Sequence, residues 1–239
     1  MNKRNAPTIQ NTWFYKRLFW DGRSHSLEDQ AFAPINSESE MHHEMGAVVR
    51  AINRIPYYRS SIREIFGDEH ADPERITIAL AAFQRTIRSQ YSRFDSFLLG
   101  NRNKLSDQEL SGLHIFRTKA GCMNCHNGPL FSDNGFHNNG LAGFDKGYYQ
   151  VTHQDADLGK MKTPSLRDVA RTGPWMHDGA LTSLEKIIDH YSDPAHSKNL
   201  DPLVRPTKLT PPEKADLLAF LRSISAPPAA FVRPKLPTD

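Results

Sequence analysis

The most regular pattern of hydrophobic positions follows Asp72-Pro73-Glu74, in which an N-cap residue precedes proline at the first helical position. Apolar residues then recur at steps of three and four: Ile76, Ala79, Leu80, Phe83, Ile87, Tyr91, Phe94 and Leu98. This spacing predicts one long helix over 73–99. Because glycine adopts the left-handed conformation without strain, we expect Gly100 to end it.

Three later segments begin with a capping box, in which Ser or Thr is followed three residues later by Glu. The pairs are Ser106 with Glu109, Thr182 with Glu185, and Thr210 with Glu213. A further helix is expected to start at Ser26 and to end before Pro34. Since no alternating apolar and polar run of convincing length occurs, any strands are expected to be short. The pattern predicts a mostly α fold.

The 239 residues carry a formal net charge of +3 and are 38% hydrophobic. No apolar run approaches the roughly 18 residues that a membrane helix requires, and no dense basic run points to nucleic acid. The long irregular stretch 127–160 is expected to serve a function. We predict a boundary near 100, giving segments 1–100 and 101–226, and an extended proline-rich tail over 227–239.

Both cysteines of the chain, Cys122 and Cys125, lie in one pentapeptide that ends in His126. Cys-x-x-Cys-His is typical of a c-type haem attachment site. Thiols three positions apart can reach both vinyl groups of one porphyrin edge, and the histidine that follows can bind the iron from the proximal side. The motif therefore predicts one covalently bound haem c.

Two other kinds of site use a Cys-x-x-Cys pair. A thioredoxin-like redox pair belongs in a βαβ context, whereas this motif follows a predicted helix. A structural zinc site needs four ligands, and the chain has no further cysteine. His137 and His153 are available as ligands, but their spacing fits no zinc pattern. Haem is the favoured interpretation, and these two stay open.

Seven short stretches beyond this pattern carry a family resemblance: RNAPT (4–8), FWDGR (19–23), SLEDQA (26–31), GCMNCHNG (121–128), KTPSLRDV (162–169), GPWMHDG (173–179) and TSLE (182–185). Together they resemble the bacterial di-haem cytochrome c peroxidase and MauG family. In that family two cytochrome c-like domains are fused, and each carries its own Cys-x-x-Cys-His. The first haem meets hydrogen peroxide and the second passes electrons to it.

The resemblance begins after the point where the first haem motif of the family is expected, and that motif and an export signal are both missing from the sequence. It therefore implies the C-terminal part of a family member. Residues 1–100 would be a helical remnant of the first, peroxidatic domain, and 101–226 would be a cytochrome c-like haem domain. A late start, a split or decayed gene and a deliberate fragment are equally compatible with this.

The resemblance also implies roles for single residues at the haem. Cys122 and Cys125 would form the thioether bonds, and His126 would be the proximal iron ligand. The opposite ligand, fourteen residues beyond His177, would be Tyr191, with Met176 and Met161 as alternatives if the helix register differs. From periodicity alone, Tyr191 would only complete an apolar helix face.

Two further roles follow from the family pattern. Glu28 matches the distal glutamate that moves a proton between the peroxide oxygens, although an early-helix glutamate is also common without such a role. Its glutamine partner in the family is replaced by Leu18. Thr172 and Pro174 match backbone carbonyls that bind calcium between the haems, and such a site would here be incomplete.

The function implied is that of a haem c oxidoreductase, the electron-transfer half of a peroxide-using enzyme; a non-catalytic mono-haem electron carrier is the alternative. The implied partners are a small electron donor of the cytochrome or cupredoxin type and hydrogen peroxide as the oxidant. Because haem is attached by thioethers outside the cytoplasm, we expect a periplasmic protein, without nucleic acid or a membrane span.

Overall fold

A computed structural model describes residues 3–141, 143–194 and 199–237 of the chain. The helices within these ranges are α1 (Leu27–Asn36), α2 (Met45–Arg54), α3 (Pro56–Phe66), α4 (Pro73–Thr86), α5 (Arg93–Leu98), α6 (Asp107–Arg117), α7 (Tyr149–Thr152), α8 (Leu184–Ser192) and α9 (Pro211–Ser223). Two short strands, β1 (Phe136–His137) and β2 (Met161–Lys162), form an antiparallel pair. The prediction of a mostly α fold with short strands is confirmed.

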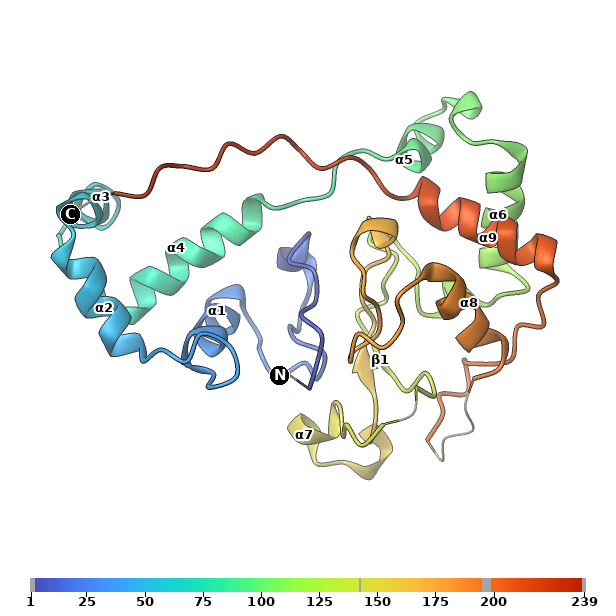
Figure 1. The fold of residues 1–239 in the computed structure, drawn as a ribbon, viewed down its shortest axis with the longest axis horizontal. Helices are drawn as coiled ribbons and strands as arrows, with labels where there is room; N and C mark the ends of the chain where they lie inside the picture. The colour runs from blue at the N-terminus through green and yellow to red at the C-terminus, as the bar shows by residue number, and fades with distance from the viewer. Residues whose placement is uncertain (1–2, 142, 195–198, 238–239) are drawn as a thin grey trace.

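The helices gather in two groups (Figure 1). Helices α1 to α4 lie on one side of the view, and α5, α6, α8 and α9 lie on the other, with β1 and α7 below and between them. The segment after α9 runs back over the top toward α3 in an extended conformation, without helix or β-strand. The tail predicted over 227–239 falls on this segment, and its last two residues lie outside the described ranges.

The larger core lies in the second group, where α6 packs against α9. Four phenylalanines form its centre: Phe94, Phe116, Phe131 and Phe220, with ring centroids 5.2–6.3 Å apart. Apolar residues of α8 and α9, among them Ile188, Leu217 and Leu221, surround this cluster. In contrast, the first group has a buried cluster of only three residues among those described: Leu18, Leu27 and Ala81.

The predicted long helix over 73–99 is wrong in the middle, because α4 ends at Thr86 and α5 starts at Arg93. Ile87 is extended, and its carbonyl accepts a hydrogen bond from the Asn11 backbone N–H at 3.0 Å. Ser92 then caps a new helix through a capping box with Asp95. Because of this break, Phe94 of α5 packs into the larger core, while the apolar residues of α4 stay with the first group.

Four other helices differ from the prediction, two in their bounds and two because they were not predicted. Pro34 does not end α1, which continues to Asn36. The cap of α8 is Ser183 rather than Thr182, and its side chain accepts from the Lys186 N–H. Helices α2 and α3 were not predicted, because α2 has no side-chain cap and α3 begins directly at Pro56. The capping box of α6 and the Glu213 contact at the start of α9 are confirmed.

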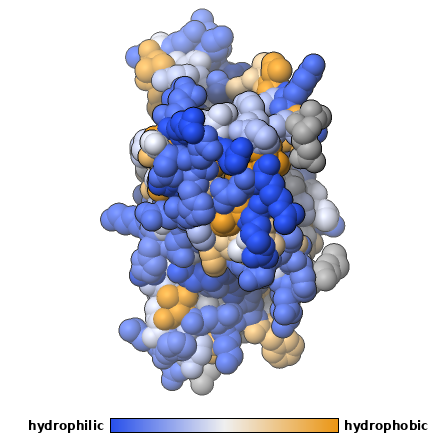
Figure 2. Space-filling view, turned by 90° about the vertical axis from the view of Figure 1, so that its left-hand side faces the viewer, coloured by the Kyte–Doolittle hydropathy of each residue, from blue (hydrophilic) through white to orange (hydrophobic). Residues whose placement is uncertain are grey.

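The end of the molecule formed by the first group is mostly hydrophilic, with separate hydrophobic spots (Figure 2). Helix α3 buries none of its residues, and its Arg63 pairs with Glu69 in the loop before α4. The Asn53 side chain bonds both backbone groups of Ala71, at 2.8 and 2.9 Å, and so ties α2 to the start of α4. None of the described helices has both the length and the apolarity to cross a membrane.

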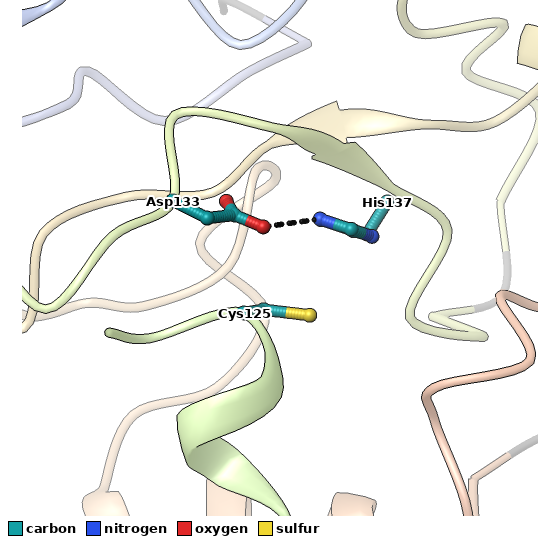
Figure 3. Close-up of side chains that lie close together, drawn as sticks. All are labelled: Cys125, Asp133 and His137. Carbon is teal, nitrogen blue, oxygen red and sulfur yellow. Dashed lines mark hydrogen bonds and ion pairs between the residues drawn. The ribbon is translucent and has the colours of Figure 1, made fainter. Parts of the chain in front are cut away.

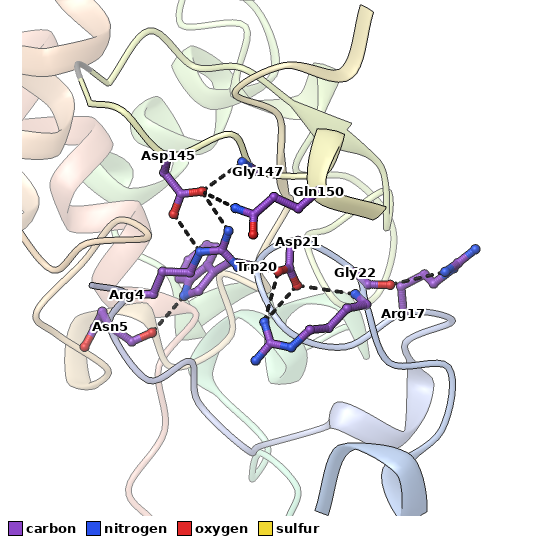
Figure 4. A network of polar contacts seen from close by, with 10 residues as sticks. Arg4, Asn5, Arg17, Trp20, Asp21, Gly22, Asp145, Gly147 and Gln150 are labelled. Atoms are coloured by element: carbon purple, nitrogen blue, oxygen red, sulfur yellow. Dashed lines mark hydrogen bonds and ion pairs between the residues drawn. The ribbon is translucent and has the colours of Figure 1, made fainter. Parts of the chain in front are cut away.

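A network of charged side chains ties the N-terminal segment to the loop before α7 (Figure 4). The Arg4 guanidinium donates two hydrogen bonds to the Asp145 carboxylate, at 2.6 and 2.7 Å, and a third to Asp21. The Trp20 Nε1–H donates to the Asn5 carbonyl at 2.8 Å in the same network. The guanidinium lowers the pKa of Asp145 to about 2, although partial burial opposes this shift.

The packing of α6 on α9 gives a first prediction. A Cβ at Gly112 would lie 2.0 Å from the Asp216 carbonyl oxygen, so Gly112→Ala must push the two helices apart. We expect this variant to lower the free energy of unfolding by about 1–3 kcal/mol in denaturant titrations. The control is Gly46→Ala in α2, where the Cβ meets only the flexible side chains of Arg50 and Glu44 and should stabilise by about 0.5–1 kcal/mol. Equal stability of both variants would contradict this account of the interface.

The Arg4–Asp145 contact gives a second prediction. Since the pKa of Asp145 is lower in the folded chain, its charge stabilises the fold above the unfolded pKa of about 4, and this stabilisation is lost as pH falls toward 2. We expect Asp145→Asn to cost about 1–2 kcal/mol of unfolding free energy near neutral pH and about half as much at about pH 3. The exposed Asp155→Asn is the control. An Asp145→Asn deficit that is the same at both pH values would show that the ion pair does not act through charge.

Candidate functional site

One cavity between the N-terminal segment and the second group of helices brings together most of the residues singled out in the sequence. Its walls are largely apolar and include Phe116, Val169, Trp175, Leu184, Ile187, Ile188, Leu217 and Leu221. The predicted haem residues and both alternative ligands also line it: Cys122, Cys125, His126, Tyr191, Met176 and Met161. The two predicted calcium residues, Thr172 and Pro174, lie in its wall as well. Glu28 does not line it.

The cysteine pentapeptide forms a tight turn directly after α6. Residues Cys122–Asn124 make one turn of 3-10 helix, and the His126 N–H donates to the Cys122 carbonyl at 2.8 Å. The His126 Nδ1 lies 2.9 Å from the Phe131 carbonyl oxygen and must donate its proton to it. The Nε2 lone pair is therefore free to bind a metal, and burial lowers the pKa of His126, which favours the neutral form that ligates.

The environment of Cys122 separates the candidate chemistries. Burial raises the pKa of this thiol to about 12, so it is protonated at neutral pH. A reactive redox pair requires the opposite, a cysteine whose pKa is lowered by positive charge or a helix N-terminus. The burial of Cys122 and its raised pKa therefore disfavour the thioredoxin-like interpretation. A buried thiol beside a large apolar cavity with a neutral histidine suits covalent attachment of a haem, and the residues present fit that group.

Asn139 lies between two of the three side chains predicted as candidates for the second iron ligand, Tyr191 and Met176. Burial raises the pKa of Tyr191 to about 12. The Asn139 Nδ2 lies 3.2 Å from the Tyr191 Oη and 3.6 Å from the Met176 Sδ. The structure thus places Tyr191 and Met176 in one cavity, where both contact the side-chain amide of Asn139.

Cys125, Asp133 and His137 are the one group of potential metal ligands found among the described residues (Figure 3). Both ring nitrogens of His137 are engaged, Nε2 with Asp133 at 2.8 Å and Nδ1 with Asp201 at 2.7 Å. The Cys125 sulfur and these two carboxylates raise the pKa of His137 to about 10. As an imidazolium it is a cation held between two carboxylates rather than a zinc ligand.

The structure places Glu28 on α1, paired with Arg85 through a contact of 2.7 Å between Oε1 and Nη2. The Arg85 guanidinium lowers the pKa of Glu28 against the opposing effect of partial burial. Its role in moving a peroxide proton stays a prediction, because the described residues around it include no second haem motif.

For calcium, the carbonyl of Pro174 already accepts a hydrogen bond from the Asn5 Nδ2 at 2.7 Å. A calcium site needs six to eight oxygen ligands. The single His, Cys, Asp and Glu group found in the described ranges does not include the 172–178 segment. Calcium at Thr172 and Pro174 therefore stays a prediction without added support.

Sequence reasoning missed several cavity residues, of which Asn139 and Trp20 have the clearest contacts. Asn139 stands in an Asn-Asn-Gly run, which indicates a turn and hides any other role. Trp20 belongs to the quoted FWDGR stretch, but only the fold shows that its indole lines the cavity and donates to the Asn5 carbonyl. No periodicity marks either side chain.

Comparison with known proteins places this site in a family. The family model described as "Di-haem cytochrome c peroxidase" matches residues 1–103. The methylamine utilization protein MauG of Methylophilus methylotrophus is 35% identical over 241 residues, spanning 99% of this chain and 72% of that protein. The chain belongs to the di-haem cytochrome c peroxidase and MauG family. The MauG of Methylorubrum extorquens is 39% identical, over 98% of this chain and 68% of that protein.

A solved structure supports the same assignment. The crystal structure of a MauG-like protein associated with microbial copper homeostasis matches with a TM-score of 0.84 and 29% identity. The match covers 94% of this chain and 76% of that one. The family resemblance and the fold class predicted from the sequence are thus confirmed. Membership of the di-haem peroxidase and MauG family implies haem c and a haem-based oxidoreductase activity.

Proposed function

We propose that this chain is the electron-transfer half of a di-haem enzyme that uses hydrogen peroxide, and that it binds one haem c. The observation that carries the proposal is that Cys122, Cys125, His126 and Tyr191 line one and the same largely apolar cavity. The sequence holds one Cys-x-x-Cys-His, whereas the family is di-haem. When bound, the haem would supply one-electron redox chemistry at its iron.

The residues of the cavity each have a part in this proposal. Cys122 and Cys125 hold the porphyrin edge, and His126 offers Nε2 to the iron because Phe131 fixes its other nitrogen. Tyr191, on the cavity wall, would offer its phenolate oxygen to the iron as the second protein ligand. A phenolate is anionic and favours the ferric and higher states, which suits a site that releases electrons. The apolar walls exclude water and lower the local dielectric, and this strengthens the ligand's effect on the potential.

The remaining predictions of domains and partners belong to the same proposal. Residues 101–226 form the haem domain, residues 1–100 belong with the peroxidatic haem, and 227–239 are a tail. Phe94 of α5 packs into the core of the haem domain and so joins the two segments. The electron donor is a small redox protein of the cytochrome or cupredoxin type. The proposed location is the periplasm, where thioether-linked haem is assembled.

The function is tested with the chain matured to carry haem c. We expect a covalent haem stain on a denaturing gel, one-electron reduction by a reduced cytochrome c-type donor, and peroxide turnover no faster than background. The control is Cys122→Ala with Cys125→Ala, which should abolish the stain. Absence of covalent haem or of reduction by the donor would refute the proposal. Rapid, saturable peroxide turnover would show instead that this chain is a complete peroxidase.

Tyr191→Phe tests the second axial ligand. Loss of an anionic donor destabilises ferric iron, so we expect a shifted ferric absorption spectrum and a higher reduction potential. The control is Tyr15→Phe, a second tyrosine that lines the cavity, whose oxygen accepts from the Ser165 N–H at 3.0 Å. Tyr15→Phe should leave the spectrum unchanged. A wild-type spectrum in Tyr191→Phe would show that Tyr191 is only a packing residue. Met176 and Met161 would then be the remaining candidates for the second ligand.

A further inference from the structure

The side-chain amide of Asn139 faces two of the candidates for the second iron ligand, Tyr191 and Met176. The Asn139 Nδ2 has two hydrogens, and it lies 3.2 Å from the Tyr191 Oη and 3.6 Å from the Met176 Sδ. Asn139 lines the cavity that holds the Cys-x-x-Cys-His residues. It comes from the irregular stretch between β1 and α7, far in sequence from both side chains that it contacts.

The orientation of this amide is fixed from two sides. The Asn139 Oδ1 accepts a hydrogen bond from the Leu141 backbone N–H at 3.2 Å, so Nδ2 must be the atom that faces Tyr191. The backbone carbonyl of Asn139 lies 3.0 Å from the His190 Nε2. His190 precedes Tyr191 on α8, and the amide is thereby tied to the helix that carries the ligand.

We propose that Asn139 is a positioning residue that donates a hydrogen bond to the Tyr191 oxygen and thereby sets the reduction potential of the haem site. This inference rests on the proposed function, in which Tyr191 is an axial ligand. A hydrogen bond to an anionic oxygen is roughly twice as strong as a neutral one. It withdraws electron density from the phenolate and so weakens its preference for ferric iron.

The same amide discriminates between the two competing ligands. A thioether sulfur is a weak acceptor, whereas a phenolate oxygen is a strong one. The amide therefore gains most when Tyr191 is the anionic ligand, and its second hydrogen holds the Met176 sulfur beside it. In this way one asparagine favours the phenolate over the thioether without binding the iron itself.

The test measures the reduction potential and the ferric absorption spectrum of the haem-loaded chain. We expect Asn139→Ala and Asn139→Asp to lower the potential and to shift the phenolate-dependent absorption. Asn139→Asp keeps the acceptor for the Leu141 N–H, so it retains the local turn if the alanine variant folds poorly. The control is Asn138→Ala, which removes the analogous bond to the Gly140 N–H and should leave both measurements unchanged. An unchanged potential in both Asn139 variants would overturn the inference.

Double variants show which ligand the amide acts through. Asn139→Ala should have no further effect on the potential in a Tyr191→Phe background, and its full effect in a Met176→Leu background. The reverse pattern would overturn the inference. If Tyr191→Phe alone changes the spectrum and the Asn139 variants do not, this inference fails and the proposed ligand stands. If Tyr191→Phe changes nothing, both the ligand assignment and this inference fail.

Discussion

The hydrogen bond from the His126 imidazole to the Phe131 carbonyl is the contact on which the site depends. It decides which ring nitrogen carries the proton and therefore which one is free to bind iron. Phe131 can present its carbonyl because its backbone turns back in a left-handed conformation, with φ of 52°. Its ring is buried among Phe94, Phe116 and Phe220, so the position of the ligand is set by the packing of the core.

The two groups of helices are stabilised in different ways, and this affects how each responds to conditions. The second group has a large apolar core, and such a core is little affected by salt or moderate changes of pH. The first group has a much smaller buried cluster and carries charged contacts such as Arg75 with Asp68 and Arg85 with Glu28. Contacts of this kind weaken with salt and at low pH. The site itself is built mainly on the more robust half.

The sequence was sufficient for features that depend on local chemistry. The haem motif, the capping box at Ser106 and the mostly α fold class all follow from short patterns, and the family resemblance identified most of the cavity residues. The break at Ile87 was missed, because the apolar spacing of α4 and α5 stays in phase across it and only the contact with Asn11 reveals the turn. Asn139 was missed since its partners lie 37 and 52 residues away in the sequence.

The position of the cavity links haem binding to folding. Its walls come from the N-terminal segment, between Asn5 and Trp20, and from the second group of helices with its loops, between Phe116 and Leu221. A group that fills this space would bury apolar surface of both at once, at about 25 cal/mol per Å². Because such a group binds the folded chain and not the unfolded one, its binding energy adds to the stability of the fold. The N-terminal segment would thereby be held against the second group of helices in two ways, by the apolar surface that it shares in the cavity and by the contact of Arg4 with Asp145.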